Sequence, residues 1–305
     1  MDNKAYVVVV GGLNLDIAGL CGQVYREKDS NIGTVALSAG GVGHNIAQNL
    51  AKLGVPVELI TVYGDDHFGR ILEEECQNDG ISLTYAARIP GGQSCTYLYV
   101  TDSQGEMMSA VNSMELIHRV TPEFLESRKE LINGASLCVV DANISEESIR
   151  WLGKNCTVPM YADPVSTIKL PRLRSLLPRL EGFKPNALEA QLLTGIEITD
   201  EASAKRAADC LLGMGVKNLF ISLGKDGIFC CNRKESALVP IVKTEIVSVN
   251  GAGDCSMAVI CWARYRFGDT LSMRRIGEMT QKAASLTLQT HKTVSPLLCE
   301  EAITK

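Results

Sequence analysis

The residues with the clearest chemical content are Val-Asn-Gly-Ala-Gly-Asp at 249–254, between a β-branched segment and a long helical pattern. The small residues Gly251, Ala252 and Gly253 let backbone N–H groups converge on one point, and the start of a helix adds its positive dipole there. We expect an anion in that nest. Asp254, in the first helical turn, can accept a proton from an alcohol that attacks a phosphoryl group. The competing interpretation is that Asp254 only caps the helix.

A second glycine-rich turn, Ser-Ala-Gly-Gly-Val-Gly-His-Asn at 38–45, also leads into a helix. Its free amides and the Asn45 side chain suit a polyhydroxy ligand. Asn14 and Asp16 follow the first predicted strand, and open α/β sheets bind ligands at the carboxyl ends of their strands. For each of these residues taken alone, turn geometry or a solvated loop position is an equally good explanation.

Two more loops have the composition of a nucleotide site. At 184–189 a strand ends and a helix begins, with Asn186 as a candidate N-cap and Glu189 three residues later. That spacing predicts a capping box, and contact with a metal or a phosphate is the alternative. The loop Ser-Leu-Gly-Lys-Asp-Gly at 222–227 can wrap a nucleotide, although a hairpin turn explains the same residues.

Several common site motifs are absent from the sequence. Neither Gly-Lys pair, at 153–154 or 224–225, has the upstream glycine and the following hydroxyl of a P-loop. The run at 41–46 places Ile46 where a dinucleotide-binding fingerprint needs its third glycine. The eleven cysteines are scattered, and the four histidines are not at ligand spacing, so we expect neither a disulfide framework nor a zinc site.

Composition excludes other classes of function. The 30 Lys and Arg against 35 Asp and Glu leave a net charge of −5, with no basic stripe for nucleic acid. No stretch approaches the ~18 apolar residues of a membrane span. The apolar run at 6–10 is too short for a signal peptide, so we expect a cytoplasmic protein without a membrane partner.

The elements that must position these residues alternate between strands and helices along the chain. Apolar runs predict strands at 6–10, 57–62, 137–140, 159–162 and 218–222. Helical spacing predicts helices at 46–53, 146–152, 202–212, 253–267 and 273–290. This alternation predicts an α/β fold with a mainly parallel sheet. Two stretches, at about 18–38 and 94–112, break the rhythm and are expected to form an antiparallel flap, inserted in a single domain that spans 1–305.

Taken in order, these pieces resemble the ribokinase, or PfkB, family of carbohydrate and nucleoside kinases. The pieces are Gly-Gly-Leu-Asn-Leu-Asp at 11–16, the turn at 40–45, Gly-Asp-Asp at 64–66, Asn186 with Glu189, the loop at 222–227 and the segment at 251–254. The resemblance implies a three-layer α/β/α sandwich with a small β lid. Stretches at 29–33, 43–51, 105–107, 143–147 and 163–166 are similar to the branch that phosphorylates the ribose 5′-hydroxyl of pseudouridine with ATP and Mg²⁺.

The resemblance also implies a role for each candidate residue. Asp254 is the base, and Gly251, Ala252 and Gly253 form the anion hole. Substrate hydroxyls are expected at Asn14, Asp16, Gly40, Gly41 and Asn45. Glu189 is expected to organise Mg²⁺ through water together with Asn186. The nucleotide is expected at Asn186, Ser222, Gly224, Gly227, Gln281 and Lys282. Some relatives bind a monovalent cation beside an aspartate six residues before the base; Ser248 stands there, which leaves that cation open.

The flap is expected to choose the substrate. Residues 94–114 contain no Lys or Arg to pair with a phosphorylated sugar, although Arg26 and Lys28 on the other flap leave that substrate open. Ser30, Thr96 and Asn112 are neutral groups that can read a nucleobase edge, and ordinary hydrogen bonding within the flap explains them equally well. Exposed flap edges predict a homodimer through the lid. A ribokinase and a catalytically silent nucleoside sensor are the alternative functions.

Overall fold

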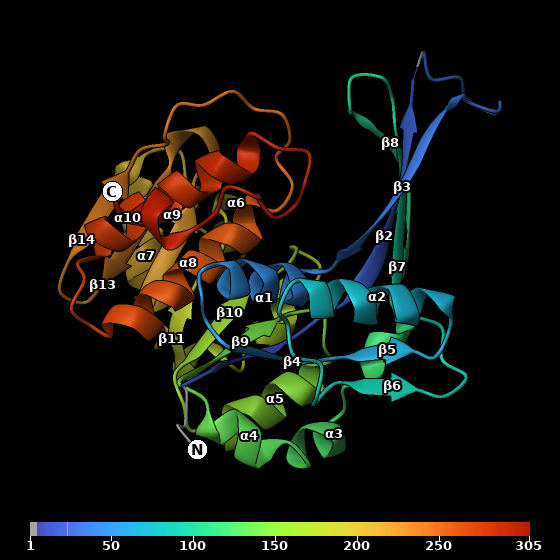
Figure 1. The fold of residues 1–305 in the computed structure, drawn as a ribbon. Helices are drawn as coiled ribbons and strands as arrows, with labels where there is room; N and C mark the ends of the chain where they lie inside the picture. The colour runs from blue at the N-terminus through green and yellow to red at the C-terminus, as the bar shows by residue number, and fades with distance from the viewer. Residues whose placement is uncertain (1–4, 23) are drawn as a thin grey trace.

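Most of the strands whose ends contribute to the candidate site belong to the main sheet. Its strands are β1 (Val7–Val10), β4 (Val57–Ile60), β9 (Leu137–Asp141), β10 (Met160–Asp163), β11 (Leu180–Phe183), β12 (Asn218–Ser222), β13 (Ile228–Asn232) and β14 (Ser236–Val239). In this computed structural model, which describes residues 5–22 and 24–305, they form an eight-stranded sheet in the order β14-β13-β12-β11-β10-β9-β1-β4 (Figure 1). The strands from β4 to β12 in this order pair in parallel, and β13 and β14 add an antiparallel edge, so the predicted mainly parallel sheet is confirmed.

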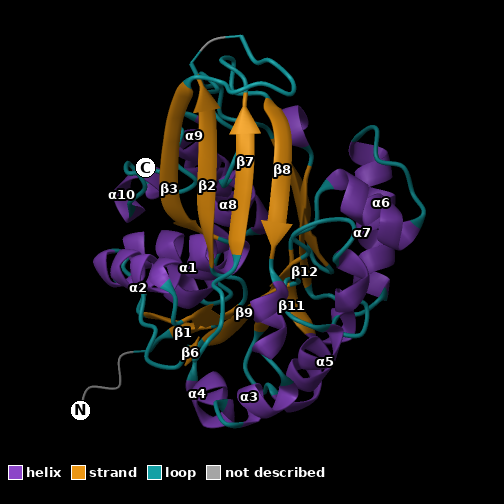
Figure 2. Cartoon of the chain, turned by 90° about the vertical axis from the view of Figure 1, so that its right-hand side faces the viewer, coloured by secondary structure: helices purple, strands orange, loops and turns teal. Residues whose placement is uncertain are grey.

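Helices cover both faces of this sheet, as the three-layer prediction requires (Figures 1 and 2). The helices are α1 (Val42–Lys52), α2 (His67–Asn78), α3 (Pro122–Glu126), α4 (Lys129–Gly134), α5 (Glu146–Asn155), α6 (Ala187–Thr194), α7 (Glu201–Gly213), α8 (Ala252–Phe267), α9 (Met273–Leu288) and α10 (Glu300–Thr304). Short 3₁₀ turns lie at Glu115–Arg119, Leu170–Leu173, Leu177–Arg179 and Gly224–Asp226.

Strand β1 shows how its sequence produces two cores. All four of its valines are fully buried, because side chains alternate between the faces and both faces are covered. Val7 and Val9 pack in the core that α1, α8 and α9 share, whereas Val8 and Val10 pack in the core of α3, α4, α5 and α7. No helix of residues 5–22 and 24–305 has both the length and the apolar character needed to cross a membrane.

The prediction of a single strand at 57–62 is wrong. The chain forms β4 and then, after the buried Thr61, β5 (Val62–Gly64), which leaves the main sheet and pairs in parallel with β6 (Ala87–Ile89). The Ala87 N–H donates to the Thr61 carbonyl at 3.0 Å, where the pairing partner changes. A continuous apolar run cannot show such a change, because both halves are buried.

A second sheet stands beside the main body as a single layer (Figures 1 and 2). We call it the lid sheet; its strands are β2 (Asn14–Cys21), β3 (Gly33–Gly40), β7 (Thr96–Thr101) and β8 (Met107–Ser113), in the order β3-β2-β7-β8. It begins four residues before the predicted flap at 18–38. Asn14 and Asp16 therefore lie at the base of a lid strand, not in a loop after β1.

The start of α1 lies unusually close to the end of β1. A Cβ atom on Gly43 would stand 2.9 Å from backbone atoms of Gly11 and Gly12. Real Cβ atoms do not approach backbone so closely, so a larger residue must push the helix away. This contact sets the position of the first turn of α1, which carries Asn45.

We expect Gly43→Ala to lower the free energy of unfolding by about 1–3 kcal/mol, because the added methyl overpacks the contact between α1 and β1. Chemical denaturation measures the change. Gly213→Ala is the matched control: that glycine ends α7 with nothing within 4 Å of its Cβ position, so stability should stay the same or rise by up to about 1 kcal/mol. Equal stability of Gly43→Ala and the wild type would contradict the close approach.

Candidate active site

Asp254 lies in the first turn of α8, directly after the glycine nest. Gly251 is the N-cap, with φ at 79°, and a Cβ there would collide with the Thr293 carbonyl oxygen. Only glycine meets both demands without strain. The Asp254 carboxylate accepts a hydrogen bond from Asn45 Nδ2 at 2.8 Å rather than from an N–H of its own helix. The helix-cap interpretation of Asp254 is therefore wrong.

Asn45 reaches Asp254 from the first turn of α1. Its side-chain oxygen lies 3.3 Å from the His44 ring nitrogen Nδ1, which favours the amide orientation with NH₂ toward Asp254. The Asn45 N–H donates to the Gly41 carbonyl at 2.8 Å. The two glycine-rich turns predicted from the sequence thus meet at one hydrogen bond between Asn45 and Asp254.

The surroundings of Asp254 tune it toward proton transfer near neutral pH. Burial raises the pKa of Asp254 to about 7, and the negative charge of Asp163 acts in the same direction. The hydrogen bond from Asn45 and the positive charge of Lys184 oppose this rise. A carboxyl group with a pKa near 7 is well matched to act as a general base at physiological pH.

A buried ion pair stands behind the nest. Lys184 Nζ lies 3.0 Å from Asp163 Oδ2, and the two side chains are only 7% and 8% exposed. Burial works against the charge on Lys184, but Asp163, Asp254 and Glu189 outweigh it and raise the pKa of this lysine. A Cβ on Gly253 would be 3.7 Å from Lys184 Nζ. A permanent positive charge therefore sits beside the backbone amides that would face an anion.

Sequence reasoning missed Lys184 and Asp163 as site residues. Asp163 is the last residue of β10, and Lys184 directly follows the neighbouring parallel strand β11. Opposite charges at the carboxyl ends of two adjacent strands are a detectable signal once the strand order is known. The sequence alone does not give that order.

A third missed residue, Asp141, joins the elements that carry the site. Its Oδ2 accepts from the backbone N–H groups of Gly12 and Gly43, both at 2.8 Å, and its Oδ1 accepts from the Asn143 N–H. The carboxylate at the end of β9 therefore ties together the end of β1 and the start of α1. This contact fixes the position of Asn45 from the opposite side of the turn.

The predicted sugar-binding residues come together at the base of the lid sheet. Asn14 Nδ2 donates to Asp16 Oδ1 at 2.6 Å, and burial raises the pKa of Asp16 to about 6. A Cβ on Gly40 would collide with the Asp16 carboxyl group. Gly41, with φ at 96°, has no room for a side chain beside the Gly12 carbonyl and Asn14. A carboxylate, an amide and two glycines thus lie together at the base of the lid sheet, and the carbonyl of one of them, Gly41, accepts from the Asn45 N–H.

The three predicted base-reading residues do not share one place. Asn112 is opposite Tyr97, which is opposite Asp16, so these three side chains share one face of the lid sheet. Thr96 is paired with Leu15 and therefore lies on the other face, which corrects its predicted grouping with Asn112. Ser30 lies in the exposed turn between β2 and β3, at the far end of β3, roughly 20 Å along the strand from Gly40 at ~3.3 Å per residue.

The predicted nucleotide residues lie along the ends of β11, β12 and β13. Asn186 and Glu189 form a capping box at the start of α6, with Glu189 Oε2 accepting from the Asn186 N–H at 2.8 Å. Ser222 is bridged to Asn186. The loop with Gly224 and Gly227 is the hairpin between β12 and β13, as the alternative interpretation predicted.

Gln281 and Lys282 lie on α9, which packs against β13 and β14. Val239 links this helix to the hairpin. The Cβ position of Gly277, one turn before Gln281, touches the Val239 side chain, and that of Gly227 meets the Val239 carbonyl. The structure thus brings α9 and the hairpin to one region, although their contact with a nucleotide stays a prediction.

Across residues 5–22 and 24–305, no three His, Cys, Asp or Glu side chains converge in a way that could hold a metal by themselves. Glu189 is buried, and only its Oε2 is occupied by the capping box. This donor set fits Mg²⁺, which keeps several waters and takes most other ligands from phosphates.

Comparison with known proteins agrees with this geometry. The model of the pfkB family of carbohydrate kinases matches residues 4–298. The chain belongs to this family. It is a phosphotransferase that acts on an alcohol group, and the ribokinase-like fold predicted from its sequence is confirmed.

Individual relatives cover nearly the whole chain. It is 34% identical to the pseudouridine kinase of Escherichia coli K12 over 97% of its length and 94% of the relative. It is 25% identical to the ribokinase of Staphylococcus aureus, covering 95% of each chain. The solved structure of Arabidopsis thaliana ribokinase with ribose and ATP superposes with a TM-score of 0.80 at 22% identity, over 95% and 96% of the two chains.

The raised pKa of Asp254 predicts a pH-dependent stability. An acid whose pKa is higher in the folded than in the unfolded state destabilises the fold as pH rises from about 4 through about 7. Asp254→Asn removes this cost, so the variant should be more stable than the wild type at pH 8, by a few kcal/mol and at most about 4. The difference should vanish near pH 4. Thermal unfolding across this range measures it, and a less stable variant at pH 8 would contradict the assignment.

Proposed function

We propose that the protein transfers the γ-phosphoryl group of ATP to the ribose 5′-hydroxyl of pseudouridine, giving pseudouridine 5′-phosphate and ADP. The observation that carries the proposal is the Asp254 carboxylate, held by Asn45 beside the Gly251 nest. The choice of pseudouridine is supported by the identity of 34% to a pseudouridine kinase, against 25% to a ribokinase.

Each part of the site has a task in this reaction. Asp254 accepts the proton of the 5′-hydroxyl while the hydroxyl oxygen forms the new bond to the γ-phosphorus. At the same time the bond between this phosphorus and the oxygen that leaves with ADP breaks. The amides of Gly251, Ala252 and Gly253, with the charge of Lys184 behind them, stabilise the transferring group. Asn14 and Asp16 hold ribose hydroxyls.

The cofactor residues complete this picture. Mg²⁺, bound through Glu189 and water, would neutralise charge on the phosphates. Ser222, next to Asn186, and the hairpin glycines Gly224 and Gly227 would line the nucleotide together with α9.

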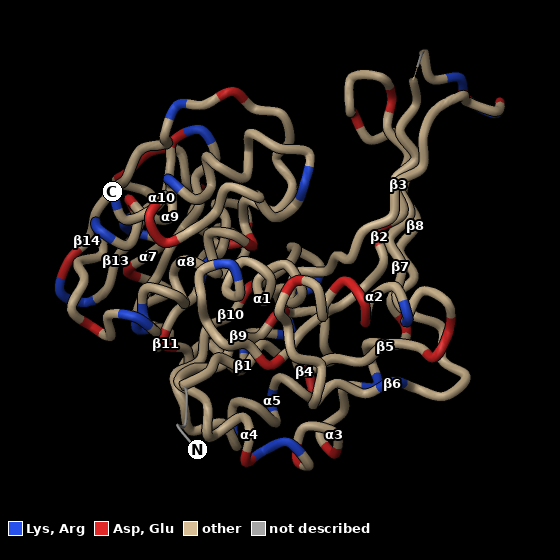
Figure 3. The backbone as a smooth tube through the Cα atoms, in the orientation of Figure 1, with Lys and Arg blue, Asp and Glu red and all other residues tan. Residues whose placement is uncertain are grey.

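The lid sheet supports a neutral substrate. Its four strands contain no Lys or Arg (Figure 3). A sugar that already carries a phosphate would find no cationic partner there. Tyr97 and Asn112 share the face of Asp16 and offer an aromatic ring and an amide to a nucleobase.

The test measures ADP release with pseudouridine, uridine, ribose, adenosine and fructose 6-phosphate. We expect the highest kcat/KM with pseudouridine, and a fall of about 10²–10⁴-fold in kcat for Asp254→Asn, because the base is lost. A preference for ribose would show the ribokinase alternative. Binding of pseudouridine without any turnover would show the silent sensor, and full activity of Asp254→Asn would refute the assigned base.

We also propose that the protein is a homodimer that pairs through the lid sheet. The face away from Asp16 carries Val35, Leu37, Leu98 and Val111, which are 74%, 47%, 41% and 62% exposed. Such an apolar patch on one side of a thin sheet is best covered by a second copy of the same sheet, because two-fold pairing makes one patch complementary to itself.

Light scattering at micromolar concentration should give twice the chain mass of 33.0 kDa. The double substitution Val35→Lys and Val111→Lys should produce a monomer, because it places charges in the covered patch. Leu192→Lys, at an exposed apolar residue of α6, is the control and should stay dimeric. A monomeric wild type would contradict the proposal.

A further inference from the structure

A hollow of about 580 Å³ lies at the end of the main sheet opposite the active site. We call it the distal hollow. It opens at the amino ends of β10, β11 and β12, beneath α8 and α9, whereas Asp163, Lys184 and Ser222 follow the carboxyl ends of the same strands. Its apolar lining consists of Tyr161, Val216, Phe220, Ile260, Leu271, Met273 and Ile276.

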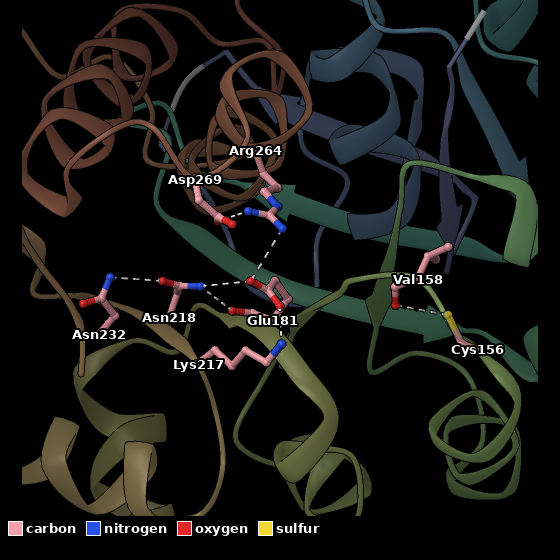
Figure 4. A network of polar contacts seen from close by, with 8 residues as sticks. All are labelled: Cys156, Val158, Glu181, Lys217, Asn218, Asn232, Arg264 and Asp269. Atoms are coloured by element: carbon pink, nitrogen blue, oxygen red, sulfur yellow. Dashed lines mark hydrogen bonds and ion pairs between the residues drawn. The ribbon is translucent and has the colours of Figure 1, made fainter. Parts of the chain in front are cut away.

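A polar network closes one side of the distal hollow (Figure 4). Glu181, which is almost fully buried, pairs with Lys217 at 2.9 Å and with Arg264 at 3.9 Å. Arg264 also pairs with Asp269, and Asn218 donates to the Glu181 carbonyl at 2.9 Å. Each of these charged side chains is therefore paired with an opposite charge of the protein. The ion pairs hold this side of the hollow in one arrangement.

The floor of the distal hollow carries an unused hydrogen-bonding group. Tyr161 is only 4% exposed, and its ring packs against Gly182, where a Cβ would collide with it. Within residues 5–22 and 24–305 the Tyr161 hydroxyl makes no hydrogen bond, yet its oxygen is not sealed in the core and so remains accessible from the hollow. Burial raises the pKa of Tyr161, so the hydroxyl stays protonated and able to donate.

The rim carries two cations that the protein does not neutralise. Arg233 and Lys234 lie in the exposed turn between β13 and β14, and neither forms an ion pair in the part of the chain that the structure describes. The neighbouring Glu235 keeps its negative charge, although its Oε1 accepts from the Met273 N–H at 2.9 Å. The turn of Arg233, Lys234 and Glu235 therefore carries a net charge of +1, and a ligand in the hollow would meet this net positive charge at the rim.

We propose that the distal hollow binds a nucleoside 5′-monophosphate. The base would lie on the apolar floor between Tyr161 and Phe220, with the Tyr161 hydroxyl as donor, and the phosphate would reach Arg233 and Lys234 at the rim. This class contains the product of the proposed function, and the inference rests on that function only in the choice of ligand.

Three elements connect the distal hollow to the active site. Strand β10 carries Tyr161 at one end and Asp163 at the other, and β11 carries Glu181 and is followed by Lys184. Helix α8 carries both Asp254 and Arg264, which are roughly 15 Å apart along its axis at ~1.5 Å per residue. A ligand that shifts these elements is positioned to alter the surroundings of Asp254.

The test is calorimetric titration of the full chain with uridine 5′-monophosphate, with the active site saturated by a non-hydrolysable ATP analogue and pseudouridine. We expect saturable binding with a Kd below about 1 mM. Arg233→Glu with Lys234→Glu should weaken it at least tenfold, and Tyr161→Phe about fivefold, as for one lost hydrogen bond. Lys154→Glu, an exposed cation on α5, is the matched control and should bind like the wild type.

Uridine and inorganic phosphate serve as partial probes and should each bind at least tenfold more weakly than the monophosphate. No saturable binding, equal binding of inorganic phosphate, or unchanged affinity in the Arg233→Glu, Lys234→Glu variant would overturn the inference. Asp254→Asn should bind the monophosphate normally, so loss of activity and loss of this site are separate results. Thermal unfolding of each variant confirms that it is folded.

Discussion

The hydrogen bond from Asn45 to Asp254 is the contact on which the rest of the structure depends. It joins two helices through residues that are 209 positions apart in the chain, and it holds a carboxylate that burial makes unfavourable to ionise. Asp163 makes ionisation harder still, while Lys184 makes it easier. The balance leaves a carboxyl group that changes its protonation state near neutral pH, beside the glycine nest where we propose that an alcohol meets a phosphoryl group.

Much of this architecture could be predicted from the sequence, because local patterns encode it. The strand β1 followed by two glycines, the nest at Gly251 and the capping box at Asn186 are each written in a few adjacent residues. The order of these pieces also gave the family. The strand predicted at 57–62 failed because a change of pairing partner leaves no mark in a run of apolar residues.

The site residues that sequence reasoning missed have a different origin. Asp163, Lys184 and Asp141 act through contacts between strands that are distant in the chain, and an isolated Asp or Lys after a strand carries no such information. The predicted grouping of Thr96 with Asn112 was wrong for a geometric reason. Thr96 pairs with Leu15 instead of Asp16, and this places its side chain on the other face of the lid sheet. One-residue register is decided by the assembled sheet.

The two faces of the lid sheet also bear on how proteins of this design can diversify. Along β2 and β7, neighbouring residues alternate between the side of Asp16 and the side of Leu98. A single amino-acid replacement therefore reaches one side only. Replacements on the face of Asp16 can change which molecules bind under the sheet and leave the outer face unchanged. Replacements on the outer face can do the reverse, so the two faces can evolve independently within the same few strands.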